Sequence, residues 1–333
     1  MKNIDDSLTT LNTDQTLPFY GNKPCIDMIL KLISNESISQ SLIFSGPSGL
    51  GKFTLSYKLA LHILHDGCET LKKTKDINTI VNKDILKLIS SSTFPDLLII
   101  SSDNKNIISV DEVREIRNFF SKKPIYSNFK ICIVNSIDKM NFYGLNAMLK
   151  SLEDLSHNSI IILIANNDHH IIPTIKSRCR VIKFFPLDLD SFSLVLRSKK
   201  IDIDHNNTIN LYKMSNGSPG IAISIHETVG MNFYDEIKSF FQHKNYDILK
   251  LHKFSENLTK RNENIEKFEY FEFFIIKILL ENIKESLSLK DTKPLKKYID
   301  VYDNVVSIFK DTKKYNLDNK RATFSILSHI NQT

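Results

Sequence analysis

Residues that break or cross-link regular structure are scarce in this chain. Of 333 residues, 9 are Gly, 9 are Pro and 4 are Cys. So little Gly and Pro argues against long flexible linkers and low-complexity arms. The cysteines are far apart and form no C-x-x-C pair, so we expect no zinc site and interpret them as small buried hydrophobes. They are Cys25, Cys68, Cys132 and Cys179.

Long hydrophobic runs are absent as well. The longest apolar stretches, 271–280 and 159–165, are far shorter than the roughly 20 residues of a membrane-spanning helix. Residues 1–16 lack the apolar segment of a secretory signal. We therefore expect a cytoplasmic protein with no membrane partner.

A strong charge of either sign is also missing. The formal net charge is +6, and 41% hydrophobic with 25% charged residues is ordinary for a globular protein. This charge permits contact with nucleic acid but does not require it, and a solvated lysine-rich surface is the simpler explanation. The length suits two or three domains.

Hydrophobic patterning predicts an α/β domain followed by helices. Short apolar runs at 41–45, 96–101, 130–136, 159–166 and 180–185 alternate with helical patterns at 52–65, 110–123 and 141–154. Continuous apolar strands alternating with helices are typical of a parallel sheet covered on both faces. After Pro186 the helical pattern dominates. We expect domains at 1–186, 187–229 and 230–333, the last two helical.

The stretch FSGPSGLGKFT, residues 44–54, predicts a phosphate-binding loop. It follows a predicted strand and begins a predicted helix, which is the context that this motif requires. Gly46, Gly49 and Gly51 allow backbone N–H groups to face a phosphate, and Lys52 reaches its outer oxygens. The alternative is a tight turn with an incidental lysine.

The groups that hold magnesium and activate water are missing from this pattern. Phe53 occupies the position where a Ser or Thr hydroxyl binds Mg²⁺. Asn135 and Ser136 end the third predicted strand, where a metal-binding carboxylate and a second, water-activating one are expected, and Asp138 comes too late. We expect no efficient ATP hydrolysis by this chain alone. Passive nucleotide binding stays open.

Several motifs resemble those of bacterial clamp-loader subunits. Residues 146–154, NAMLKSLED, resemble the signature NALLKxLEEP, and residues 173–180, PTIKSRCR, resemble PTIxSRC. Further stretches fit the delta-prime family of DNA polymerase III, namely 94–97, 107–114, 217–220 and 315–318. The resemblance covers residues 20–220 well and the last hundred residues loosely.

This resemblance implies an AAA+ module, a helical lid and a helical collar that holds a pentamer together. The chain would be a non-hydrolysing structural subunit that supports ATP-driven loading of the sliding clamp onto primed DNA. Its partners would be the gamma/tau ATPase subunits and the delta subunit. It would need no cofactor, with ATP and Mg²⁺ bound only in neighbouring subunits.

The resemblance also gives Arg178 a role as an arginine finger in trans. A guanidinium stabilises the charge on a phosphoryl group in transfer. The alternatives are that Arg178 caps the turn or pairs with a carboxylate.

Three features depart from the family pattern. Only Cys68 lies where many delta-prime subunits have a four-cysteine zinc module. Leu155 and Ser156 replace a proline, and Ile221 and Ala222 stand where ATPase subunits have a nucleotide-sensing arginine.

Other hypotheses rest on fewer residues. An ATP-hydrolysing motor subunit is supported by the Gly loop and Lys52, and a DNA-binding protein only by the net charge. The adjacent His169 and His170 would face opposite ways on a strand, so we expect no metal there. The aromatic run at 268–274 is interpreted as the apolar face of a collar helix, with a partner surface as the alternative. Its members are Phe268, Tyr270, Phe271, Phe273 and Phe274.

Overall fold

The computed structural model describes eight segments of the chain. They are residues 18–34, 40–79, 94–101, 107–167, 171–242, 247–259, 264–289 and 292–331. The chain divides into two compact units, Met1–Ile221 and Ala222–Thr333. Each unit is described by itself below. The domain boundaries expected near residues 186 and 229 stay predictions.

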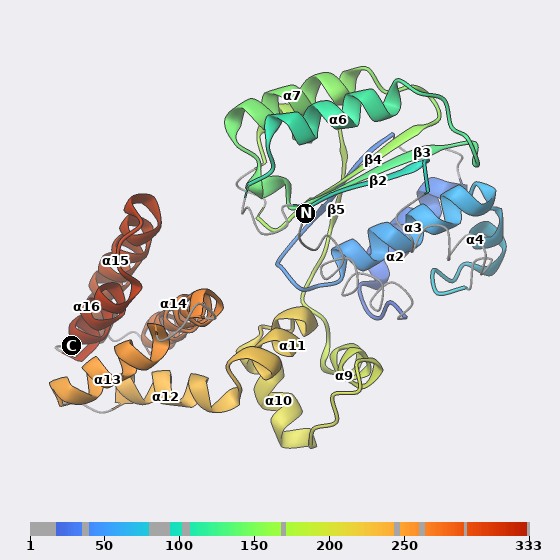
Figure 1. The fold of residues 1–333 in the computed structure, drawn as a ribbon. Coiled ribbons are helices and arrows are strands. Elements are labelled where there is room, and N and C mark those ends of the chain that lie inside the picture. Colours follow the sequence, from blue (N-terminus) through green and yellow to red (C-terminus); the bar gives the residue numbers. More distant parts are fainter. Residues whose placement is uncertain are drawn as a thin grey trace. The chain divides into compact units, whose positions relative to one another are not determined.

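The first unit is built on a parallel five-stranded sheet, which confirms the predicted α/β architecture (Figure 1). The strand order is β2-β3-β4-β1-β5, so β1 lies between β4 and β5 and next to both. The strands are β1 (Ser41–Ser45), β2 (Leu97–Ser101), β3 (Lys130–Asn135), β4 (Ser159–Ala165) and β5 (Arg180–Lys183). Every residue of β1 and β4 is buried, as expected for central strands of a sheet covered on both faces.

Helices cover both faces of this sheet (Figure 1). On one face lie α2 (Lys23–Ser34), α3 (Lys52–Asp66) and α4 (Glu69–Thr74), and on the other lie α6 (Val110–Phe120) and α7 (Phe142–Glu153). Alternate residues of a strand serve different cores: Ile131 and Ile133 pack with the α3 side, whereas Cys132 and Val134 pack with the α6–α7 side. The continuous apolar strands of the sequence are therefore explained by burial on both faces.

Local signals fix where the helices on the α6–α7 side begin and end. Ser109 and Glu112 form a capping box at the start of α6, and Asn141 accepts the N–H of Gly144 at the start of α7. Helix α6 ends at Phe120, three residues before the predicted end. Pro124 follows, and a proline disfavours helical backbone at the residue before it.

The rest of the first unit and the whole second unit are helical in the described residues. After the short α8 (Pro173–Lys176) and β5 come α9 (Leu189–Ser198), α10 (His205–Met214) and α11 (Pro219–Thr228), which crosses the division between the units. The second unit continues with α12 (Met231–Gln242), α13 (Ile248–Thr259), α14 (Asn264–Ser288), α15 (Thr292–Tyr315) and α16 (Asn319–Asn331). Within the described ranges, no helix is both long and apolar enough to span a membrane.

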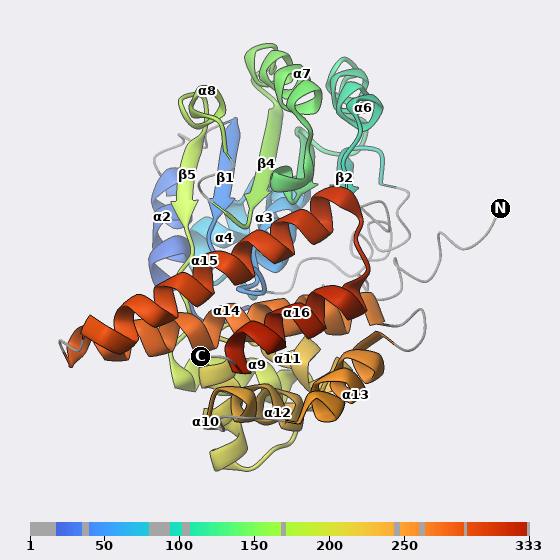
Figure 2. The ribbon, with the colours of Figure 1, turned by 90° about the vertical axis from the view of Figure 1, so that its left-hand side faces the viewer.

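An aromatic core holds the second unit together, and α14 and α15 lie side by side there (Figure 2). Phe268, Phe271 and Phe274 are buried, and the ring of Phe309 from α15 contacts both Phe268 and Phe271. The expected apolar face of a helix is confirmed for these three residues of α14, whereas the role of this helix in a collar stays a prediction. Tyr270 and Phe273 are half-buried.

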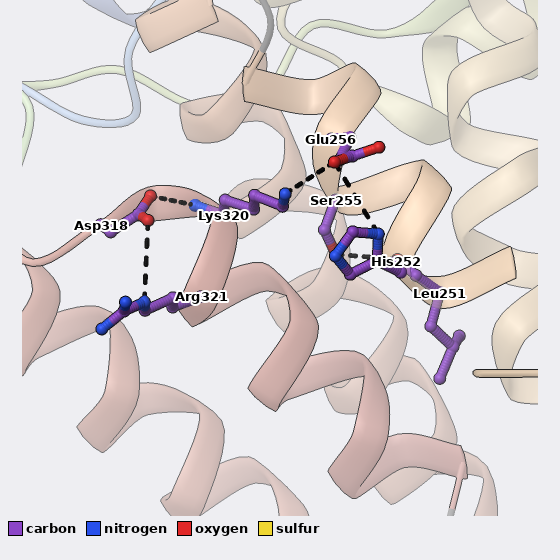
Figure 3. A network of polar contacts seen from close by, with 7 residues as sticks. All are labelled: Leu251, His252, Ser255, Glu256, Asp318, Lys320 and Arg321. Atoms are coloured by element: carbon purple, nitrogen blue, oxygen red, sulfur yellow. Dashed lines mark hydrogen bonds and ion pairs between the residues drawn. The ribbon is translucent and has the colours of Figure 1, made fainter. Parts of the chain in front are cut away.

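A polar network joins α13 to the start of α16 (Figure 3). The Lys320 Nζ atom donates to Glu256 Oε1 at 2.7 Å, and the same oxygen lies 3.9 Å from His252 Nδ1. The Asp318 carboxylate accepts the backbone N–H of Lys320 at 2.9 Å and thereby caps α16. The stretch 315–318, which fits the family motif, thus connects the last residue of α15 to the start of α16.

A buried carboxylate organises the loop before β3. Asp96 is 0% exposed, and its oxygens accept the backbone N–H groups of Ile125, Tyr126 and Ser127 at 2.7–3.1 Å. Charge-assisted bonds of this kind are roughly twice as strong as neutral ones. Asp96 therefore fixes the chain between α6 and β3.

Replacing Asp96 should weaken the first unit. Asp96→Asn removes the charge and turns one acceptor oxygen into a donor, so we expect a loss of about 2–3 kcal/mol in the free energy of unfolding. Urea denaturation followed by circular dichroism measures this loss. Asp202→Asn, at an exposed position, is the matched control and should change stability by less than about 0.5 kcal/mol. Equal losses in the two variants would contradict the role of Asp96.

Candidate functional site

The predicted phosphate-binding loop connects β1 to α3 and has the backbone that its glycines allow. Gly46, Gly49 and Gly51 all have positive φ angles, of 148°, 75° and 79°. A Cβ atom at Gly46 would lie 2.5 Å from the carbonyl oxygen of Phe184, at the end of β5. The loop is therefore a specific turn at the carboxyl edge of the sheet, where ligands of parallel α/β sheets bind.

Lys52 begins α3 and closes the loop from within. Its side chain is buried, with 4% of the residue exposed, and its Nζ atom donates to the carbonyl oxygens of Gly46, at 2.7 Å, and Pro47. Burial lowers the pKa of Lys52 to about 8, and the negative charge of Asp138 opposes this shift. The loop itself thus binds the ammonium group, which was expected to help the loop hold a phosphate.

The turn at residues 217–220 packs directly on the tip of the loop. The Ser218 hydroxyl donates to the carbonyl oxygen of Ser48 at 2.7 Å, and the Gly220 N–H donates to that of Gly49 at 2.9 Å. A Cβ atom at Gly49 would lie 2.5 Å from Ser218 Oγ, so the close approach requires glycine. The structure brings this family motif and the loop together.

Phe53 occupies the position after Lys52 as a packing residue. Its half-buried side chain lies against the core on the α3 side of the sheet, and its ring stacks on Tyr57 with centroids 6.3 Å apart. A benzyl side chain has no oxygen with which to bind a metal. The side chain at this position therefore packs against the protein's own core and offers no metal ligand.

The ends of β3 and β4 carry polar groups that bind one another. Asp138 Oδ2 accepts the backbone N–H of Asn166 at 2.6 Å, and Asn166 Nδ2 donates to Ser136 Oγ at 3.1 Å. Ser136 has φ 68°, which is unusual for a residue other than glycine and marks a strained turn. Asn135 ends β3 and is half-buried. The carboxylate of Asp138 is thus used to join the ends of two strands.

Sequence reasoning missed Asn166 as a member of this site. It is the first residue after β4, which lies between β3 and β1 in the sheet. The available signal was a polar residue at the carboxyl end of a fully apolar strand, because such ends meet at the ligand-binding edge.

Arg178 lies on the turn between α8 and β5, and its guanidinium has contacts on three nitrogens. Nε and Nη2 lie 2.9 and 2.6 Å from Glu153 Oε1, and Nη1 donates to the carbonyl oxygen of Thr174 at 3.0 Å. Arg178 therefore both caps the turn and pairs with a carboxylate, the two alternatives that the sequence left open. Its side chain is still 39% exposed. A role in trans stays a prediction.

The remaining candidate ligands do not form a metal site in the described part of the chain. There, no three residues among His, Cys, Asp and Glu are grouped so that they could hold a metal ion. Cys25, Cys68 and Cys132 are buried, and Cys179 is half-buried. His169 and His170 lie outside the described residues.

Comparison with known proteins identifies the family. The family model described as "DNA polymerase III, delta subunit" matches residues 21–188, just over half of the chain. This chain belongs to the DNA polymerase III delta-subunit family. The match covers the whole sheet, the phosphate-type loop and the Arg178 turn. The predicted resemblance to the clamp-loader subunits of DNA polymerase III is therefore confirmed, as is the predicted architecture of a parallel α/β module with a helical C-terminal region.

Individual relatives of this chain are also named as subunits of DNA polymerase III. The chain is 27% identical to the DNA polymerase III subunit delta' of Pseudomonas aeruginosa over 190 residues, 56% of each protein. It is 24% identical to the subunit delta' of Buchnera aphidicola over 290 residues, 86% of this chain and 82% of the relative. It is also 29% identical to the subunit tau of Bacillus subtilis over 181 residues, 54% of this chain and 30% of tau. The chain is thus similar both to delta' subunits and to a tau subunit of DNA polymerase III.

The buried ammonium of Lys52 predicts a pH dependence of stability. Its pKa is about 8 in the folded chain, against an ordinary value of 10.5 for lysine. Between these values the unfolded chain holds more protons, so stability rises with pH. The free energy of unfolding of the wild type relative to Lys52→Met should therefore rise from pH 8 to pH 10.5, by an amount on the order of 3 kcal/mol. Urea titrations across this range measure it, and parallel pH profiles would contradict the burial of a charged lysine.

Proposed function

We propose that this chain is a non-hydrolysing structural subunit of a DNA polymerase III clamp loader. It supports the ATP-driven loading of a sliding clamp onto primed DNA by the assembled complex. One observation carries this proposal: Phe53, in the position of the magnesium-binding hydroxyl, packs against the core of its own unit. The other features of the loop are consistent with a site that does not bind magnesium or activate water.

The residues at the loop do not fit a magnesium ion. Mg²⁺ requires oxygen ligands in near-octahedral geometry, supplied in this motif by a hydroxyl and a carboxylate. Phe53 supplies no oxygen, and Asn135 and Ser136 supply no charge at the end of β3. Both oxygens of Asp138 accept backbone N–H groups, those of Asn166 and Asn167. We therefore propose that ATP and Mg²⁺ are bound in neighbouring subunits.

The chain's own chemical contribution would be the guanidinium of Arg178. It lies on an exposed turn, and its planar fork suits the oxygens of a phosphate. We propose that it reaches the ATP site of a neighbouring subunit, and that the neighbours are gamma/tau and delta subunits in a five-membered ring. Similarity to a DNA polymerase III subunit tau over 54% of this chain supports a place in a complex of such subunits.

An ATP-hydrolysing subunit is the second candidate function. The three positive-φ glycines and the similarity to tau favour it. The two candidates differ in where hydrolysis takes place: in this chain, or in its neighbours with help from Arg178.

The first test replaces Arg178 in the reconstituted complex. Arg178→Ala should leave assembly intact and stop turnover at the site that Arg178 serves, because a finger contributes about 10³–10⁵ in rate. ATPase assays at saturating clamp and primed DNA measure the loss, and gel filtration measures assembly. Arg180→Ala removes the same charge at an exposed position two residues away and should keep full activity. Unchanged turnover in Arg178→Ala would contradict the finger role.

The second test restores the missing hydroxyl. Phe53→Thr should not produce ATP hydrolysis by the isolated chain, because the carboxylates expected after β3 are still absent. It should also cost about 1–2 kcal/mol of stability, since half-buried aromatic surface is lost. Phe53→Leu keeps most of the packing and is the control for stability. Magnesium-dependent turnover in Phe53→Thr would show that the loop lacks only the hydroxyl, and would favour the second candidate.

A further inference from the structure

The guanidinium of Arg178 is held by two elements that the sheet fixes in place. Glu153 is the last residue of α7, which buries Met148 and Leu152 against the sheet. Thr174 belongs to α8, which is anchored by the fully buried Ile175. Both elements thus have rigid packing behind them, although the Arg178 and Glu153 side chains are 39% and 53% exposed.

We propose that Glu153 is a positioning residue that orients Arg178 for a phosphate in a neighbouring subunit. This inference rests on the proposed role of Arg178 in trans. Glu153 Oε1 contacts Nε and Nη2, on one edge of the guanidinium, and the Thr174 carbonyl accepts from Nη1. Two contacts on one edge and a third on another nitrogen fix the plane of the group as well as its place.

The chemistry of arginine explains why such a hold is useful. A guanidinium has five N–H groups, so three contacts leave two N–H groups for the oxygens of a phosphate. A long, exposed side chain otherwise loses rotamer freedom when it binds, at the moment when it must stabilise developing charge. A guanidinium that is oriented beforehand avoids this loss. The effect belongs to the transition state, so it should appear in kcat rather than in KM.

The neighbouring residue provides a matched control. Asp154, next to Glu153, pairs with Arg117 of α6 at 3.2 Å, and its side chain is 59% exposed. Each of the two carboxylates therefore forms its own exposed ion pair at the end of the same helix, and only Glu153 contacts Arg178. Exposed pairs of this kind contribute little to stability, so the two substitutions should have similar, small effects on folding.

The experiment measures steady-state ATP turnover of the complete reconstituted complex with Glu153→Ala, Asp154→Ala and Arg178→Ala. Glu153→Ala should lower the part of kcat that Arg178→Ala removes about three- to tenfold, with little change in KM. Asp154→Ala should match the wild type. Glu153→Asp should restore part of the rate, since it retains the charge. The advantage of the wild type over Glu153→Ala should also shrink at high salt, because the ion pair is exposed.

A double substitution separates positioning from a structural effect. If Glu153 acts through Arg178, adding Glu153→Ala to Arg178→Ala should cause no further loss, whereas independent effects would multiply. A further loss in the double variant would overturn the inference, as would a Glu153→Ala complex that is as fast as Asp154→Ala. A faster complex would also overturn it, because Glu153 would then compete with the phosphate.

The same assay distinguishes two outcomes: the positioning role of Glu153 is wrong, or the proposed role of Arg178 in trans is wrong. If Arg178→Ala lowers turnover and Glu153→Ala does not, the positioning role alone is wrong. If Arg178→Ala leaves turnover unchanged, the role in trans is wrong, and the positioning role falls with it.

Discussion

The ammonium of Lys52 and the loop around it constrain everything else at this site. A charged amine with little exposed surface must find oxygen partners, and here it finds them in the carbonyl groups of Gly46 and Pro47. These bonds hold the loop in a conformation that only glycine backbones allow. The same conformation brings Gly49 against Gly220 and so joins the loop to the turn that begins α11.

The site has two parts, the loop and the Arg178 turn, which differ in whether their side chains stay exposed. At the loop, the side chains expected near a nucleotide make contacts within the protein. Lys52 donates to backbone carbonyl groups, Phe53 packs against the core, and Asp138 accepts a backbone N–H at the end of β4. At the Arg178 turn, the guanidinium is oriented by α7 and α8 but stays exposed. This difference between the two parts is the basis of the proposed role of Arg178 in trans.

Much of this arrangement could be predicted from the sequence, because the signals that specify it lie within short stretches of the chain. Runs of Ile and Leu buried on both faces predicted all five strands to within about two residues, and the helical patterns predicted the starts of α6 and α7 to within one residue. The Gly-rich stretch predicted the loop because it lies between a strand and a helix. These signals act over a few residues, so one sequence is enough to read them.

The contacts that decide the function of the site are not local and could not be predicted in this way. Glu153 meets Arg178 across 25 residues, and Ser218 meets Ser48 across 170. The use of Asp138 by Asn166 depends on β3 and β4 being neighbours, which the strand pattern alone does not specify. Motifs named the residues of the Arg178 turn, but only the fold showed which carboxylate holds the arginine.

The most direct measurement of the central claim is a single-turnover experiment with the isolated chain in excess over labelled ATP and with magnesium present. Excess protein fills any weak site, so slow product release cannot hide a chemical step. The account predicts no release of phosphate above the rate of the protein-free solution. Phosphate release that rises with protein concentration, and is lost in Lys52→Met, would contradict it.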